Sequence, residues 1–224
     1  MKNRLWNVCC RLVSIALNLT VVYLETIAAP ISWDAVGMQM FTFYTENSNL
    51  FTSGVCILVA LGQLWALVTG GELPVWIKRL KFIATSCLTM TMLTVIFVLA
   101  PWYGDGWLYT LLFTSSMLYH HFLNPVIAIV SFTIFERTPP LRLCNVPLAL
   151  VPSLIYGSIA LWANIAHLLD GPYPFLQVYN QPAQQTEIYC AFVLISNLFY
   201  AWLVWLLGGN ARRTRGRVGL AFRG

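Results

Sequence analysis

The chain has 224 residues, of which 58% are hydrophobic and only 9% are charged, and its mean hydropathy is +0.70. A soluble domain carries about 25% charged residues, so this composition excludes a water-soluble globule, and it also excludes a disordered chain and a disulfide-stapled secreted domain. The class that remains is a polytopic membrane protein. Its net charge of +5 then needs an explanation that fits a membrane protein.

Six segments of the chain are apolar over the length of about 20 residues that a transmembrane helix needs. We therefore expect an all-α integral membrane protein, built as a single bundle of six transmembrane helices. No linker, low-complexity stretch or internal repeat divides residues 1–224 into two domains. In chain order the expected spans are residues 8–28, 36–68, 80–100, 107–135, 146–169 and 188–207, followed by a basic tail over residues 208–224.

The Lys and Arg residues fall in alternate connections of this arrangement. Basic residues near span ends accumulate on the cytoplasmic side, so both termini are expected in the cytoplasm. The basic tail is expected to bind anionic lipid headgroups, and the net charge therefore does not require nucleic acid as a partner. The groups are Lys2, Arg4 and Arg11; Lys78, Arg79 and Lys81; Arg137 and Arg142; and Arg212, Arg213, Arg215, Arg217 and Arg223.

Three polar residues of the first span, Arg11, Asn18 and Glu25, recur at seven-residue spacing and share one helix face. This face is either a polar seam directed into the bundle, or a face from which Arg11 and Glu25 reach toward the two membrane interfaces. The second interpretation is favoured, because long charged side chains near span ends ordinarily extend toward the headgroups.

The second span contains an unusual polar run, Thr45-Glu46-Asn47-Ser48-Asn49. Helical spacing places Thr45 and Asn49 on one face and Glu46 on an adjoining one. Such residues also hold membrane helices together by hydrogen bonds, and by composition alone this packing interpretation is favoured.

The fourth span contains a second polar cluster, His120-His121 followed by Asn124-Pro125. His121 and Asn124 lie three residues apart and share a face, whereas His120 points about 100° away from His121. Pro125 has no N–H and is expected to kink the helix by freeing the carbonyl of His121. Two adjacent His residues before Asn-Pro in a span favour a functional site over simple packing.

By depth in the membrane, the side chains of Thr45 and His121 are expected to meet. Imidazole is the base best suited to take the proton of a Thr hydroxyl near neutral pH, which would activate Thr45 as a nucleophile. The amides of Asn49 and Asn124 are candidate donors to the resulting oxyanion. Glu46 lies on a different face from Thr45, so a full triad is not predicted.

Three segments resemble a known family. Residues 41–50 resemble the F-x-[YF]-[FY]-T-x-x-S-N-L pattern of bacterial six-helix membrane proteins related to the androgen-induced gene family, residues 121–125 resemble their H-x-x-N-P element, and residues 173–175 their Tyr-Pro-[FY] element. Eukaryotic members hydrolyse fatty acid esters of hydroxy fatty acids with an intramembrane Thr and His.

The resemblance implies a multipass lipid ester hydrolase of the bacterial plasma membrane, with Thr45 as the nucleophile and His121 as the base. The eukaryotic spacing between His and Pro is met instead by His120, which makes His120 the alternative base. An acyl transferase acting on lipid esters from the bilayer is the closely related possibility.

Two other functions remain open. The Thr/Asn/His cluster suits a small transporter or channel, although no inverted repeat supports one. A non-catalytic lipid-binding protein is also possible. The six cysteines show no CxxC or Cys/His spacing of the kind that binds metals, so neither a metal nor a cofactor is expected.

Overall fold

The computed structural model describes residues 2–137, 139–208 and 210, and over this part of the chain the regular structure is all helical, without strands. Six helical stretches in it are long and apolar enough to cross a membrane, which confirms the all-α class and the number of spans. These stretches are Leu5–Thr42, Tyr44–Thr69, Val75–Tyr103, Leu118–Phe135, Leu143–Ile165 and Ala183–Leu207. The residues of the basic tail from 211 to 224 lie outside the described part.

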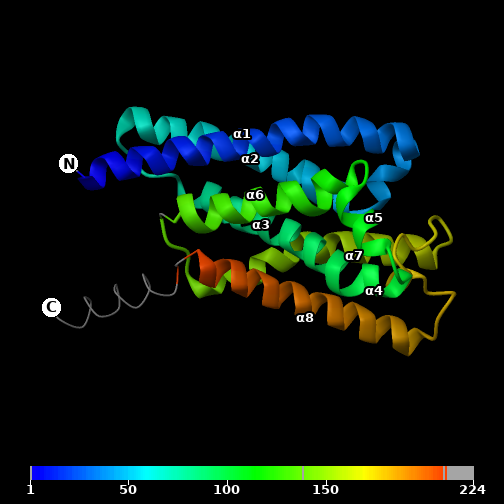
Figure 1. The fold of residues 1–224 in the computed structure, drawn as a ribbon. Helices are drawn as coiled ribbons and strands as arrows, with labels where there is room; N and C mark the ends of the chain where they lie inside the picture. The colour runs from blue at the N-terminus through cyan, green and yellow to red at the C-terminus, as the bar shows by residue number, and fades with distance from the viewer. Residues whose placement is uncertain (1, 138, 209, 211–224) are drawn as a thin grey trace.

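The helices run back and forth along one axis (Figure 1). Helices α1 (Lys2–Val36) and α2 (Tyr44–Thr69) pack along one side, α3 (Val75–Thr94) and α6 (Asn124–Val130) lie in the middle, and α8 (Ala183–Leu207) follows the opposite side. The start of α1 and the end of α8 lie at the same end of the bundle. We call the other end the distal end; it carries η1 (Gly37–Thr42), α4 (Ala100–Tyr103), α5 (Trp107–Phe113) and the loop 166–182 after α7 (Leu150–Ile165).

The second span begins later than expected, at Tyr44 instead of residue 36. Helix α1 continues through Pro30 to Val36, and Gly37 then adopts a left-handed backbone with φ of 58° that ends it. The 3₁₀ helix η1 links α1 to α2. As a result, Thr45 lies in the first turn of α2 and not within a longer helix.

The fourth span is interrupted, in contrast to the expected continuous helix over residues 107–135. Helix α5 ends at Phe113, and Ser115 has a φ of 51°, so the chain turns before it re-enters the bundle as a π-helical segment, η3 (Leu118–Leu123). Pro125 follows in the first turn of α6, where its missing N–H leaves an α-helical bond unmade. A second π segment, η4 (Ser131–Phe135), ends the span.

Lys78 and Lys81 are expected in a connection between spans, but the structure places both within α3. Both side chains are fully buried. Lys81 Nζ donates to Asn18 Oδ1 (2.7 Å) and Asn18 Nδ2 donates to Glu136 Oε1 (2.7 Å). Ser14 and Ser131 also donate to this carboxylate. A buried Lys is tolerated because its charge is hydrogen-bonded and shares a network with a carboxylate.

The polar face of α1 is a seam directed into the bundle. Asn18 and Glu25 are both buried, so the favoured interpretation, in which Glu25 reaches the membrane interface, is wrong. Arg11 differs, because its guanidinium donates to the carbonyl of Gly71 (2.7 Å) in the connection between α2 and α3. Ser14, Asn18 and Glu25 therefore supply polar partners to α3 and to the interrupted fourth span.

The remaining spans match the expected ones with shifted ends. The third consists of α3, a π segment η2 (Val95–Leu99) and α4. The fifth begins as a 3₁₀ helix, η5 (Leu143–Ala149), and continues as α7. Phe82 of α3, Phe132 of η4, and Val204 and Trp205 near the end of α8 pack in one hydrophobic core.

Candidate functional site

Thr45 is the second residue of α2, and its side chain is only 7% exposed. The residue before the helix, Phe43, has an extended backbone, and its side chain makes no capping hydrogen bond. The first N–H groups of a helix have no partner within it and form its positive end. Thr45 is thus held where the backbone favours negative charge.

His121 lies beside Thr45, as the sequence predicts: Thr45 Oγ1 is 3.2 Å from His121 Nε2. The other ring nitrogen, Nδ1, is 2.6 Å from the carbonyl oxygen of Leu111 in α5. A carbonyl oxygen only accepts, so Nδ1 carries the proton, and in the neutral ring Nε2 has the free lone pair. This is the tautomer in which His121 accepts the hydrogen bond of the Thr45 hydroxyl.

His120 is directed to two carboxylates and not to Thr45. Its Nε2 is 3.3 Å from Glu25 Oε2, its Nδ1 is 3.9 Å from Glu46 Oε1, and all three side chains are buried. The two adjacent His residues therefore have different partners. Only His121 is within hydrogen-bonding distance of Thr45, whereas the alternative base His120 contacts two carboxylates.

Asn49 and Asn124 are buried and connected to Thr45 by hydrogen bonds, but they line neither of the cavities described below. Asn49 Nδ2 donates to the carbonyls of Thr45 (2.9 Å) and His120 (3.3 Å). Asn124 Nδ2 donates to Asn49 Oδ1 (3.0 Å) and Glu25 Oε2 (3.2 Å). Both amides are used in joining α1, α2 and the fourth span, and the structure does not bring them to the position expected of oxyanion donors.

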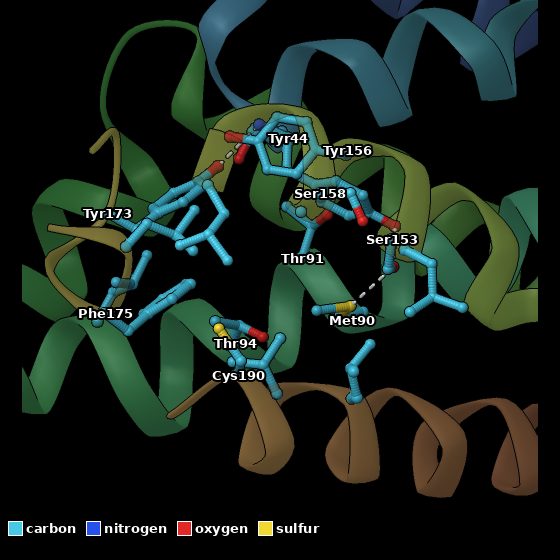
Figure 2. A pocket seen from close by; sticks show the side chains of 18 of the residues that line it. Tyr44, Met90, Thr91, Thr94, Ser153, Tyr156, Ser158, Tyr173, Phe175 and Cys190 are labelled. Atoms are coloured by element: carbon cyan, nitrogen blue, oxygen red, sulfur yellow. Dashed lines mark hydrogen bonds between the residues drawn. The ribbon is translucent and has the colours of Figure 1, made fainter. Parts of the chain in front are cut away.

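Two cavities meet at Thr45. The first has a volume of about 190 Å³ and lies between α2, α3, α7 and α8, with a largely apolar lining (Figure 2). The second, of about 210 Å³, lies at the distal end, and its lining includes Glu46, His121 and the end of α1. Among the described residues, Thr45, Leu99 and Tyr173 line both cavities.

Polar groups in the first cavity are few and mostly satisfied. The Tyr44 hydroxyl lies 2.9 Å from Ser153 Oγ, and Asn197 Nδ2 donates to the same oxygen (2.7 Å). Ser153 also contacts the Met90 sulfur, as Figure 2 shows. The remaining wall, with Phe175 on one side and α8 below, suits an apolar ligand.

Tyr173 is a site residue that sequence reasoning placed only in an aromatic element of the last distal loop. Its hydroxyl accepts the N–H of Tyr44 (3.0 Å), and its ring stacks on Phe175 with centroids 5.2 Å apart. Burial raises the pKa of the Tyr173 phenol to about 12, so it is protonated at neutral pH. The only sequence signal for it is the Tyr-Pro-[FY] element over residues 173–175.

Gly171 holds the turn that carries Tyr173, because a Cβ there would lie 2.5 Å from the backbone oxygen of Leu176. We expect Gly171→Ala to displace this turn and to lower the free energy of unfolding by about 1–3 kcal/mol, as overpacking generally does. Thermal unfolding in detergent measures the change. Gly157→Ala in α7, where a Cβ meets nothing within 4 Å, is the matched control and should be neutral or slightly stabilising. Equal stability of the two variants would contradict the prediction.

No group of three or more His, Cys, Asp and Glu side chains within the described residues could hold a metal ion. Comparisons of the chain with protein-family models, with curated proteins and with solved structures find no match. The function of the site therefore has to be inferred from its geometry alone. This geometry consists of a Thr hydroxyl, a His in the accepting tautomer, and two cavities that both include Thr45 in their lining.

Proposed function

We propose that this protein is a membrane-embedded hydrolase or acyl transferase that acts on lipid esters, with Thr45 as the nucleophile and His121 as the base. The observation that carries the proposal is the 3.2 Å contact between Thr45 Oγ1 and His121 Nε2, with the other nitrogen of the ring held by the Leu111 carbonyl. The activity agrees with the one that the resemblance to the androgen-induced gene family implies.

The chemistry takes place in two stages. His121 Nε2 takes the hydroxyl proton as Thr45 Oγ1 bonds to the ester carbonyl carbon, whose electron pair moves onto the carbonyl oxygen. When this intermediate collapses, the ester C–O bond breaks and His121 gives its proton to the leaving alcohol. Water, or a second alcohol in the transferase reaction, then adds to the acyl-Thr45 through the same proton transfers and releases the acid or the new ester.

The two cavities suggest how a lipid ester is bound. The apolar cavity between α3, α7 and α8 would take the acyl chain, which places the ester carbonyl at Thr45. The second cavity, lined by Glu46 and His121, would receive the alcohol part or the attacking water. Fatty acid esters of hydroxy fatty acids are one such substrate class, and they would enter sideways from the bilayer.

We place both termini in the cytoplasm and the protein in a bacterial plasma membrane. The start of α1 and the end of α8 lie at one end of the bundle, as an even number of spans requires. Arg137 and Arg142 flank the connection between the fourth and fifth spans at that end. The basic tail over residues 208–224 would then meet the anionic headgroups of the inner leaflet.

The proposal is tested with a fluorophosphonate, whose phosphorus accepts the oxygen of an activated hydroxyl and releases fluoride. We expect mass spectrometry of the detergent-purified protein to find the adduct on Thr45, and none in Thr45→Ala. Thr89→Ala is the matched control, because Thr89 is buried in α3, bonds to the carbonyl of Thr85 and lines neither cavity. This variant should be labelled like the unchanged protein.

Absence of any adduct on folded protein would contradict the proposal. Flux of solutes into liposomes would then be the next measurement, because the same polar cluster suits a transporter.

A further inference from the structure

We infer that Tyr173 is a further catalytic residue, whose phenolic O–H donates a hydrogen bond to the oxyanion that forms when Thr45 attacks the ester. This inference rests on the proposed function and gives a chemical role to Tyr173, for which the sequence indicates only a Tyr-Pro-[FY] element. The proton of His121 alone does not complete the reaction, because negative charge develops on the carbonyl oxygen and needs a donor of its own.

The two amides expected in this role are committed elsewhere. Each proton of Asn49 and of Asn124 is donated within one network, to the carbonyls of Thr45 and His120, to Asn49 Oδ1 and to Glu25. Neither residue lines the two cavities in which the oxyanion would form. The donor must therefore come from the cavity walls.

Tyr173 meets this requirement by its position. Thr45, Leu99 and Tyr173 line both cavities, so they surround the point where an ester carbonyl would lie. Leu99 has no side-chain donor, and the proton of Thr45 is given to His121. Among the side chains of these three residues, the Tyr173 hydroxyl is the one left to donate.

The hydrogen bonds around Tyr173 also set the direction of its proton. Its oxygen accepts the N–H of Tyr44 (3.0 Å), which occupies one lone pair and leaves the phenolic proton for another partner. The neighbouring Tyr156 hydroxyl uses its own proton on the carbonyl of Thr42 (2.7 Å). Neither of these two hydrogen bonds uses the phenolic proton of Tyr173, which can therefore be donated to the oxyanion.

The ring of Tyr173 is held from two sides before any substrate arrives. It stacks on Phe175 and meets Phe43 edge-on, with the centroids of the latter pair 6.2 Å apart. Figure 2 shows Tyr173 and Phe175 together at one side of the apolar cavity. A donor fixed in this way stabilises a transition state without reorganisation, which is the property that makes oxyanion donors effective.

The test compares two Tyr→Phe variants of the same loop. The second-order rate constant for phosphonylation of Thr45 by the fluorophosphonate should fall by about 10²–10³-fold in Tyr173→Phe, the loss typical for removal of one oxyanion donor. Tyr179→Phe is the matched control, because the Tyr179 hydroxyl bonds to the carbonyl of Ile165 (2.7 Å) and the residue lines neither cavity. Its rate constant should stay within about twofold of that of the unchanged protein.

A third variant shows whether the loss comes from the missing hydrogen-bond donor or from a change in the structure of the site. Replacing Tyr173 by p-aminophenylalanine returns an N–H donor to the same ring position and should restore most of the rate. Two results overturn the inference, provided that Thr45 of the unchanged protein is labelled. One is an unchanged rate constant in Tyr173→Phe, and the other is a loss in the p-aminophenylalanine variant as large as that in Tyr173→Phe. If Thr45 of the unchanged protein is not labelled at all, the proposed function fails instead.

Discussion

Replacing His121 by Gln should lower the turnover of a chromogenic acyl ester by about 10²–10⁴-fold, which is the usual contribution of a general base. The Gln side chain has no basic nitrogen, so the proton of Thr45 Oγ1 would lose its acceptor 3.2 Å away. His120→Gln removes the neighbouring imidazole but leaves the Thr45–His121 contact and the Leu111 bond intact. Activity should persist in this variant.

Turnover is measured in detergent micelles on protein whose thermal unfolding is followed in parallel. A stable His121→Gln variant that keeps full activity would contradict the role of His121 as the base. A complete loss in His120→Gln together with full activity in His121→Gln would exchange the two roles. His120 would then be the base, as the His–Pro spacing of the eukaryotic proteins that the chain resembles implies.

Lys81→Met should lower the free energy of unfolding by about 3–5 kcal/mol, because removal of one partner leaves a buried charge without compensation. In the native protein Lys81 is fully buried and reaches Glu136 through Asn18, with bonds of 2.7 Å on each side. The variant would leave the Glu136 carboxylate buried in the bundle without the positive charge of Lys81, which Asn18 links to it. Equilibrium unfolding in detergent measures the loss.

The double variant Lys81→Met/Glu136→Met is the informative comparison. Removing both charges together should recover part of the lost stability, because well-packed apolar groups can replace a buried ion pair at little cost. Losses that add in the double variant would show that the two charges do not interact. The prediction would then be wrong.

Much of the fold could be predicted from composition and periodicity, because hydrocarbon allows few alternatives to a helix. The meeting of Thr45 and His121 could also be predicted, since both lie at comparable depth in their spans. The late start of α2 could not, because it depends on how Gly37 ends α1 and on the 3₁₀ turn that follows.

The misplaced residues have a common cause. Residue spacing alone places Lys78 and Lys81 at one membrane interface and Glu25 at the other, because charge in a span is ordinarily expensive. Here Asn18 bonds to Lys81 and links it to Glu136, and His120 is the partner of Glu25. Such compensation comes from helices distant in the sequence, and residue spacing within one helix cannot reveal it. The same holds for Tyr173, whose position depends on the packing of the loop 166–182 on α2.

The π segment η3 makes the site sensitive to changes in chain length. Its bonds link residues five apart in place of four, so it accommodates one residue more than an α-helical turn of the same span. Deleting one residue of this segment, such as Phe122, would let it relax to an α-helix while its two flanks keep their relative orientation. The side chains within the segment would not keep theirs, because His121 would then lie two residues before Asn124 instead of three. Asn124 would keep its place against Glu25 only if His121 left Thr45. We therefore expect deletion of Phe122 to cost far more activity than its replacement by another apolar residue.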